Sequence, residues 1–163
     1  MTTAIFFSGP IGAGKTTLGR SVAGQIDAAF IDGDDHADQS RPWFASSRST
    51  NRNIADAALS ALQLRPAVVI AYPLRCTSYV YFRRRMTDAG HLPIFVTLRA
   101  SAESILTVGR GREFGEDERA RIFEMIAQGY ADRPFSDLVV DTDAASFDQT
   151  VDMLLARLMP LLA

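Results

Sequence analysis

The sequence contains a single lysine, and it lies in the glycine-rich octapeptide Gly9-Pro10-Ile11-Gly12-Ala13-Gly14-Lys15-Thr16. This spacing matches G-x-x-x-x-G-K-[ST], the pattern of a phosphate-binding loop. A lysine ammonium is a compact charge on a flexible stem, so it can reach phosphates from a tight turn where a planar guanidinium cannot. The motif predicts ATP and Mg²⁺ as cofactors and leaves open whether another triphosphate is preferred. It predicts nucleotide contacts from Gly9, Ile11, Gly12, Ala13, Gly14, Lys15, Thr16 and Thr17, with Lys15 also catalytic.

A second group of chemically capable residues is the acidic segment Phe30-Ile31-Asp32-Gly33-Asp34-Asp35-His36. Phosphoryl transfer to an alcohol needs positioning, charge neutralisation and a carboxylate to accept the hydroxyl proton. We therefore expect Asp32, with Thr16, on the metal side, and Asp34 beside the substrate hydroxyl as the catalytic base. The alternative is a solvated acidic turn. His36 is either a further substrate contact or a surface histidine.

A third segment, residues 109–118, combines three glycines with strong charge and has almost no apolar residue to anchor it. Mobile segments over phosphate sites serve as closing lids. We expect such a lid here, with Arg110 or Arg112 stabilising charge on the transferring phosphoryl group. The alternative is an ordinary charged loop between two helices.

Several arginines fall in segments that should border the acceptor site. Guanidinium groups bind carboxylate or phosphate in bidentate fashion, so several together favour an anionic acceptor. Each could instead be a solvated surface arginine. Trp43, the only tryptophan, is a candidate apolar wall of the same pocket. The expected substrate contacts, besides Asp34 and His36, are Trp43, Arg48, Arg52, Arg75 and Arg133.

Alternating strand and helix patterns must position these residues. Short apolar runs predict strands over Ala4–Ser8, Ala28–Ile31, Ala67–Tyr72, Ile94–Leu98 and Leu138–Val140. Apolar residues at helical spacing predict helices over Lys15–Gln25, Arg52–Leu64, Ser78–Ala89, Ala102–Val108, Asp117–Gln128 and Phe147–Met159. This order predicts an α/β fold of the P-loop nucleoside-triphosphate hydrolase type, a doubly wound five-stranded parallel sheet in one domain spanning residues 1–163. Ligands are expected at the carboxyl ends of the strands.

Composition narrows the functional classes. A net charge of −2 argues against a nucleic-acid partner. The sequence has no run of about 18 apolar residues, so no membrane-spanning helix is expected. The lone Cys76 and the absence of a cleavable leader pattern favour a cytoplasmic protein. The chain has neither N-K-x-D nor D-x-x-G, so it lacks the signals of a common GTPase. A small-molecule acceptor is therefore the expected partner, and the protein is expected to be a monomer or a homodimer.

The sequence resembles the gluconate kinase and shikimate kinase group over nearly its whole length. The segments that resemble gluconate kinases are Ala28-Ala29-Phe30-Ile31-Asp32-Gly33-Asp34, Arg41-Pro42-Trp43 and Asp137-Leu138-Val139-Val140-Asp141. Arg133-Pro134-Phe135 resembles the arginine segment by which shikimate kinases hold the substrate carboxylate. Tyr72-Pro73-Leu74-Arg75 stands where shikimate kinases have a glycine triplet, and it weakly resembles the corresponding segment of adenylylsulfate kinases.

The resemblance implies an ATP-dependent phosphotransferase that acts on a hydroxyl of a small polar metabolite. Two alternatives remain at this point. One is a regulatory protein that binds or hydrolyses ATP without an acceptor, and the other is a polynucleotide 5′-kinase, which would need a basic groove.

Overall fold

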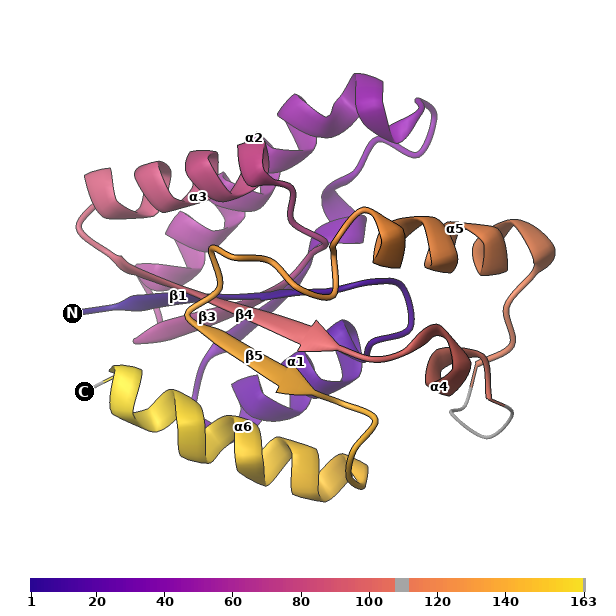
Figure 1. Ribbon diagram of the computed structural model, residues 1–163. Coiled ribbons are helices and arrows are strands. Elements are labelled where there is room, and N and C mark those ends of the chain that lie inside the picture. Colours follow the sequence, from indigo (N-terminus) through magenta and orange to yellow (C-terminus); the bar gives the residue numbers. More distant parts are fainter. Residues whose placement is uncertain (108–111, 163) are drawn as a thin grey trace.

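A five-stranded parallel sheet forms the centre of the protein, whose computed structural model describes residues 1–107 and 112–162. The strand order is β2-β3-β1-β4-β5, and every neighbouring pair is parallel (Figure 1). The strands are β1 (Thr3–Ser8), β2 (Ala29–Asp32), β3 (Ala67–Ala71), β4 (Leu92–Arg99) and β5 (Leu138–Asp141). In the register, Ile5 of β1 pairs with Val69 of β3 and with Ile94 of β4. The predicted five-stranded α/β fold is confirmed.

Helices cover both faces of the sheet, as the consecutive apolar residues of the central strands require. Helices α1 (Lys15–Gln25) and α6 (Phe147–Leu162) pack on one face, and α2 (Trp43–Leu62) and α3 (Cys76–Asp88) pack on the other (Figure 1). All six residues of β1 are buried because it lies in the middle of the sheet. The helical residues that are buried on the two faces include Leu18, Val22, Leu154 and Leu158 on the first and Ile54, Ala58, Phe82 and Met86 on the second.

The remaining helical segments lie beyond the carboxyl ends of the strands. They are the short 3₁₀ helix η1 (Gly33–His36), α4 (Ala102–Leu106) and α5 (Glu116–Ala127). Parallel strands present their carboxyl ends at one edge, where these folds bind ligands. The helix predicted over Ala102–Val108 ends at Leu106 among the described residues, and Val108 lies outside them. In the part of the chain that the structure describes, no helix combines the length and the apolar character needed to cross a membrane.

The beginning of α2 differs from the sequence prediction. The helix begins at Trp43, whereas the apolar pattern predicted a start at Arg52. The first turns contain serine, threonine and arginine in place of a repeating apolar residue, so no apolar stripe marks them. Ser46 and Thr50 are nevertheless buried, and the Ser46 hydroxyl donates to the Pro42 carbonyl (3.4 Å). These additional turns carry Trp43 and Arg48 as helical residues.

Candidate active site

The phosphate-binding loop joins β1 to α1, as its motif predicts. Gly12 has a φ of 79°, which an L side chain rarely adopts. A Cβ atom at this position would lie 2.5 Å from Cγ2 of Ile105 and 2.9 Å from the ring of Phe114. Glycine is therefore required both by the turn and by the close approach of the segments that cover it.

Lys15 lies inside the curve of this loop. Its ammonium group donates to the carbonyl oxygens of Gly9 (3.0 Å) and Pro10 (2.7 Å). Burial lowers the pKa of Lys15 from its ordinary value of 10.5 to about 8, although the negative charges of Asp34 and Asp32 partly oppose this effect. The burial of the Lys15 ammonium group in the loop therefore has an electrostatic cost.

Thr16 and Asp32, the two residues expected to hold a metal, lie within hydrogen-bond distance of each other. The Thr16 hydroxyl donates to Oδ2 of Asp32 (2.9 Å), and Oδ1 of Asp32 accepts from the backbone N–H of Asp34 (3.1 Å). Asp32 therefore caps the 3₁₀ helix η1 while it holds the threonine hydroxyl. Mg²⁺ prefers hard oxygen ligands and commonly takes only one or two protein groups plus substrate phosphates. The hydroxyl and carboxylate beside a phosphate loop fit that requirement.

Asp34 follows in η1 and interacts electrostatically with Lys15. Its pKa is raised above 3.8 by burial and by the nearby Asp32 carboxylate, while Lys15 acts in the opposite direction. The turn before it is fixed by close packing, because a Cβ at Gly33 would lie only 2.4 Å from Cδ2 of Tyr72. Burial and the charge of Asp34 also raise the pKa of the Tyr72 phenol. A carboxylate with a raised pKa is better suited to accept a proton than an ordinary exposed aspartate.

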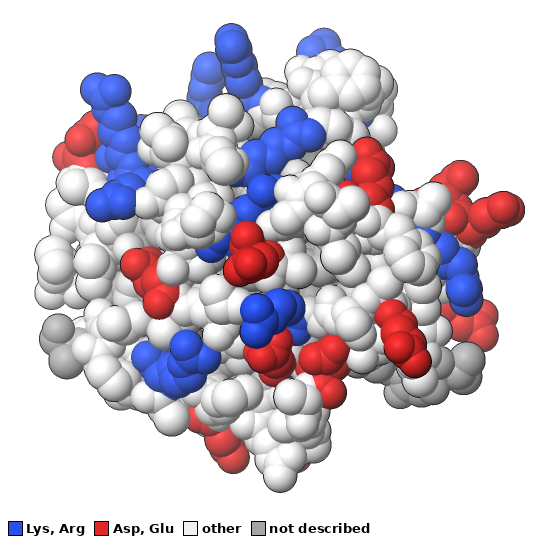
Figure 2. All heavy atoms as spheres, viewed as in Figure 1, with Lys and Arg blue, Asp and Glu red and all other residues white. Residues whose placement is uncertain are grey.

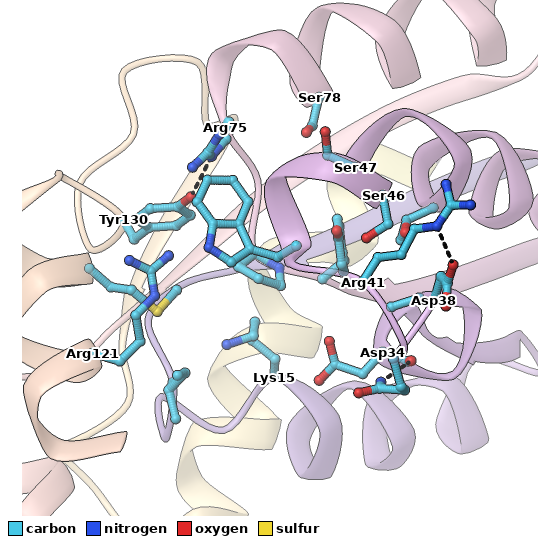
Figure 3. Close-up of a pocket in the computed structure, with 18 residues that line it drawn as sticks. Lys15, Asp34, Asp38, Arg41, Ser46, Ser47, Arg75, Ser78, Arg121 and Tyr130 are labelled. Carbon is cyan, nitrogen blue, oxygen red and sulfur yellow. Dashed lines mark hydrogen bonds and ion pairs between the residues drawn. The ribbon is translucent and has the colours of Figure 1, made fainter. Parts of the chain in front are cut away.

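Two hollows meet at these residues. The smaller one, which we call the loop hollow, has a volume of about 230 Å³ and is lined by the loop together with Ile105, Arg112 and Phe114. The larger one, which we call the central hollow, has a volume of about 390 Å³ and lies between α2, α3 and α5 (Figure 3). Ile11, Lys15 and Asp34 line both hollows. A ligand in the loop hollow and a ligand in the central hollow would therefore meet at Lys15 and Asp34.

Aromatic and guanidinium groups stack at the far wall of the central hollow. The Arg75 guanidinium lies over the Trp43 ring, 3.7 Å from its centroid, and its Nε donates to the Tyr130 hydroxyl (3.2 Å). The Arg121 guanidinium lies 5.7 Å from the centroid of the same tryptophan ring. Trp43 is half exposed, so it forms a rim of the hollow. The structure thus brings the predicted residues Trp43 and Arg75 together with Asp34.

Sequence reasoning missed most of the other residues that line the central hollow. Tyr72 directly follows β3, so the rule that ligands lie at strand carboxyl ends could have identified it. Arg121 comes from the middle of α5, and no sequence signal shows that this helix faces the hollow. The further lining residues that were not predicted include Arg41, Ser46, Ser47, Thr50, Ser78, Met125 and Tyr130.

The predicted lid is only partly within the described residues. Arg110 lies outside them. Arg112 lines the loop hollow, forms an ion pair with Glu118, and lies with its guanidinium 5.0 Å from the centroid of the Phe114 ring. Its charge also lowers the pKa of Lys15, which places it within electrostatic range of the phosphate loop.

Four of the predicted substrate residues do not line the central hollow. Arg133 donates to the carbonyl oxygens of Leu74 (3.1 Å) and Gln128 (3.1 Å), so two of its nitrogen atoms serve the backbone. The carbonyl of His36 accepts a hydrogen bond from the Asn53 side chain (3.4 Å). Arg48 and Arg52 line a third hollow, which is formed by residues of α2, α3 and Arg75.

A long-range hydrogen bond supports the phosphate loop from behind. The Thr142 hydroxyl, just after β5, donates to the carbonyl of Ala13 (2.9 Å) and lies 3.3 Å from the carbonyl of Arg99 at the end of β4. The backbone N–H of Thr142 donates to the same Arg99 carbonyl (2.8 Å). The loop is therefore connected directly to the last strand of the sheet.

No known protein-family model and no curated protein matches this chain. Solved structures do. A gluconokinase from Sinorhizobium meliloti 1021 superposes with a TM-score of 0.76 at 19% identity, covering 98% of this chain and 93% of that one. A shikimate kinase from Acinetobacter baumannii, solved with shikimate, has a TM-score of 0.65 at 19% identity, with 100% and 97% covered.

An APS kinase from Mycobacterium tuberculosis, solved with AMPPNP and APS, gives a TM-score of 0.67 at 19% identity, with 97% of this chain and 98% of that chain covered. Likenesses at this level of identity concern the fold. They confirm the resemblance expected from the phosphate loop and the segment after β2. The chain has the fold found in gluconate, shikimate and APS kinases.

Proposed function

We propose that this protein is an ATP-dependent phosphotransferase that moves the γ-phosphoryl group to a hydroxyl of a small, polar, anionic metabolite. The observation that carries the proposal is the junction of the two hollows. Lys15 and Asp34 line both, so a phosphate-binding site and a second ligand site share one ammonium and one carboxylate. This is the arrangement that direct transfer between two bound molecules requires.

The residues divide the work as follows. Backbone N–H groups of the loop and the Lys15 ammonium hold the phosphates. Thr16 and Asp32 would hold Mg²⁺, which neutralises charge on the phosphate oxygens when bound. Asp34 accepts the proton of the acceptor hydroxyl, and the oxygen of that hydroxyl forms a bond to the γ-phosphorus. The bond from that phosphorus to the bridging oxygen breaks, and ADP leaves with the electron pair.

The central hollow favours this function over a regulatory ATPase that has no acceptor. The residues that line it include Ser46, Thr50 and Tyr130, whose hydroxyl groups suit a hydrophilic second ligand. A regulatory ATPase would need no such second ligand site. The solved relatives include complexes with shikimate and with APS, both anionic, which supports the same class of acceptor here.

The test is a screen of hydroxylated acids and phosphate esters with Mg²⁺ATP, in which ADP release is measured by a coupled assay. At least one acceptor should stimulate ADP release well above the rate with water alone. Lys15→Ala should abolish that stimulation, and Arg84→Ala, an exposed residue on α3, should not. ATP binding with no stimulation by any acceptor would favour the regulatory ATPase, and full turnover by Lys15→Ala would contradict the assignment of the loop.

A further inference from the structure

A third hollow lies beside the central hollow, against α2 and the beginning of α3. It has a volume of about 430 Å³. The residues that line it are Ser47, Arg48, Asn51, Arg52, Arg75, Thr77, Ser78 and Tyr81. Three are arginines and none is acidic, so we call it the arginine hollow.

No carboxylate among the described residues pairs with the arginines of the arginine hollow. Neither Arg48 nor Arg52 forms an ion pair with any residue that the structure describes, and Arg75 bonds to the neutral Tyr130 hydroxyl. Lys and Arg side chains also predominate on the upper part of the face in Figure 2, over the layer of α2 and α3. Arg48 and Arg52 are exposed, so an anion that enters the hollow can reach both guanidinium groups without displacing a carboxylate of the described residues.

Two of the three arginines of the central hollow differ in this respect, whereas Arg75 lines both hollows and forms no ion pair with the described residues. Arg41 forms an ion pair with Asp38 (3.4 Å), and Arg121 forms one with Glu124 (2.7 Å). An anionic group of the acceptor would therefore compete with carboxylates in the central hollow. It would meet no such competition in the arginine hollow.

Asn51 provides a second, independent indication of a ligand. Its Nδ2 donates to the Ser78 hydroxyl (3.3 Å), while its Oδ1 is buried and has no hydrogen-bond partner among the described residues. A buried polar atom without a partner costs about 1–3 kcal/mol, and native structures leave few of them. A rotation of this amide, which lines the hollow, would let the oxygen accept a hydrogen bond from a ligand hydroxyl next to the anionic group.

The arginine hollow is continuous with the central hollow. Ser47, Arg75 and Ser78 line both. In Figure 3 these three residues lie at the end of the central hollow opposite Lys15 and Asp34. A ligand that reaches both sites must therefore be extended, with its anionic group at one end and the hydroxyl that reacts at the other.

We propose that the acceptor is an extended, polyhydroxylated phosphate ester, whose phosphate binds in the arginine hollow and whose distal hydroxyl lies at Asp34. Three guanidinium groups match a dianionic phosphate better than a single carboxylate. The product then carries two phosphate groups. This inference rests on the proposed function, because it identifies the class of acceptor for the same site.

Binding without ATP tests the inference separately from catalysis. The probes are a hexose monophosphate, the corresponding sugar acid, and inorganic phosphate, each titrated by calorimetry. Trp43 serves as a second reporter, since Arg75 stacks on its ring at 3.7 Å and it is the only tryptophan. The phosphate ester should bind at least about tenfold more tightly than the sugar acid. Equal binding of the two would overturn the proposed phosphate class.

The double variant Arg48→Gln/Arg52→Gln should weaken binding of the phosphate ester by roughly tenfold or more, since two charged hydrogen-bond donors are lost. The matched control is Arg65→Gln/Arg84→Gln, which removes the same charge from two exposed ion pairs outside the three hollows. Its affinity should stay within about twofold of the wild type. Equal affinities of the two double variants would refute the arginine hollow as the phosphate site.

Asn51→Asp provides a further check because it replaces the amide group by a negatively charged carboxylate of similar size and removes the Nδ2 donor to Ser78. It should repel the phosphate ester and lower its affinity at neutral pH, and undiminished affinity would count against the proposal. Calorimetry with Mg²⁺ATP should give unchanged affinity in all of these variants. If ATP binds and a sugar acid is phosphorylated while the arginine variants have no effect, the inference fails and the kinase proposal remains.

Discussion

Replacing Lys15 by methionine should stabilise the protein in the absence of nucleotide. The folded state lowers the pKa of Lys15 from 10.5 to about 8, so the charged form is disfavoured on folding. At ~1.4 kcal/mol per pH unit, that gap corresponds to about 3 kcal/mol of unfavourable free energy at pH 7. Methionine removes this cost but also loses the hydrogen bonds to Gly9 and Pro10, worth about 1 kcal/mol each. We expect a net gain of about 1–2 kcal/mol in the free energy of unfolding at pH 7.

The pH dependence gives the sharper measurement. Below pH 8 both folded and unfolded states carry the lysine proton, so the full cost is present. Between pH 8 and 10.5 the folded state releases the proton while the unfolded state keeps it, and the stability of the wild type rises relative to Lys15→Met. The difference between the two proteins should therefore change by about 2.5 kcal/mol in favour of the wild type between pH 7 and pH 10.

Urea unfolding followed by circular dichroism, in the presence of reductant, measures this difference. The comparison is well defined because the chain has no other lysine. Arg20→Met, at an exposed position on α1, is the control, and its difference from the wild type should be independent of pH. A difference between wild type and Lys15→Met that is flat within about 0.5 kcal/mol would refute the electrostatic cost assigned to this loop.

Three further predictions concern residues around the base and its turn. Asp34→Asn should lower kcat by about 10²–10⁴-fold with little change in the KM for ATP, whereas Asp35→Asn should stay near the wild-type rate in the coupled ADP assay. Because the pKa of Asp34 is raised, kcat should begin to fall at a higher pH than 3.8 as the solution is acidified, and an acid limb centred at or below 3.8 would contradict its role as base. Gly33→Ala should lower the free energy of unfolding by about 1–3 kcal/mol, because the new Cβ would clash with Tyr72, and thermal unfolding measures this change. The control Gly24→Ala, where a Cβ on α1 would meet open space, should be neutral or stabilising.

The sequence predicted the parts of the site in which local chemistry fixes local structure. The glycine spacing determines the loop and the start of α1. The apolar residues before Asp32 form β2, which is an edge strand of the sheet. Both features depend on residues close together in the chain, so their patterns are visible in the sequence. The pair formed by Thr16 and Asp32 is consistent with the carboxyl ends of β1 and β2 lying at the same edge of the sheet, although β3 lies between the two strands.

The wall of the central hollow was not predictable in the same way. Arg121 lines this hollow because α5 lies beyond the carboxyl ends of the strands. Tertiary packing determines that position of the helix. The start of α2 was missed because polar residues such as Ser46 are buried there, against their usual preference. The residue type of Arg133 did not show that its Nε and Nη1 donate to backbone carbonyls, and its predicted contact with a substrate stays a prediction.

The hydrogen bond from Thr142 to Ala13 has a consequence for the order in which the parts of the protein fold. It joins positions 129 residues apart, so this support for the loop arises only after the fifth strand has docked. Contacts of such long sequence separation form late, because the chain must first lose the entropy of the intervening segment. A polypeptide still emerging from the ribosome would therefore lack this hydrogen bond to its phosphate loop until the residues after β5 had been synthesised.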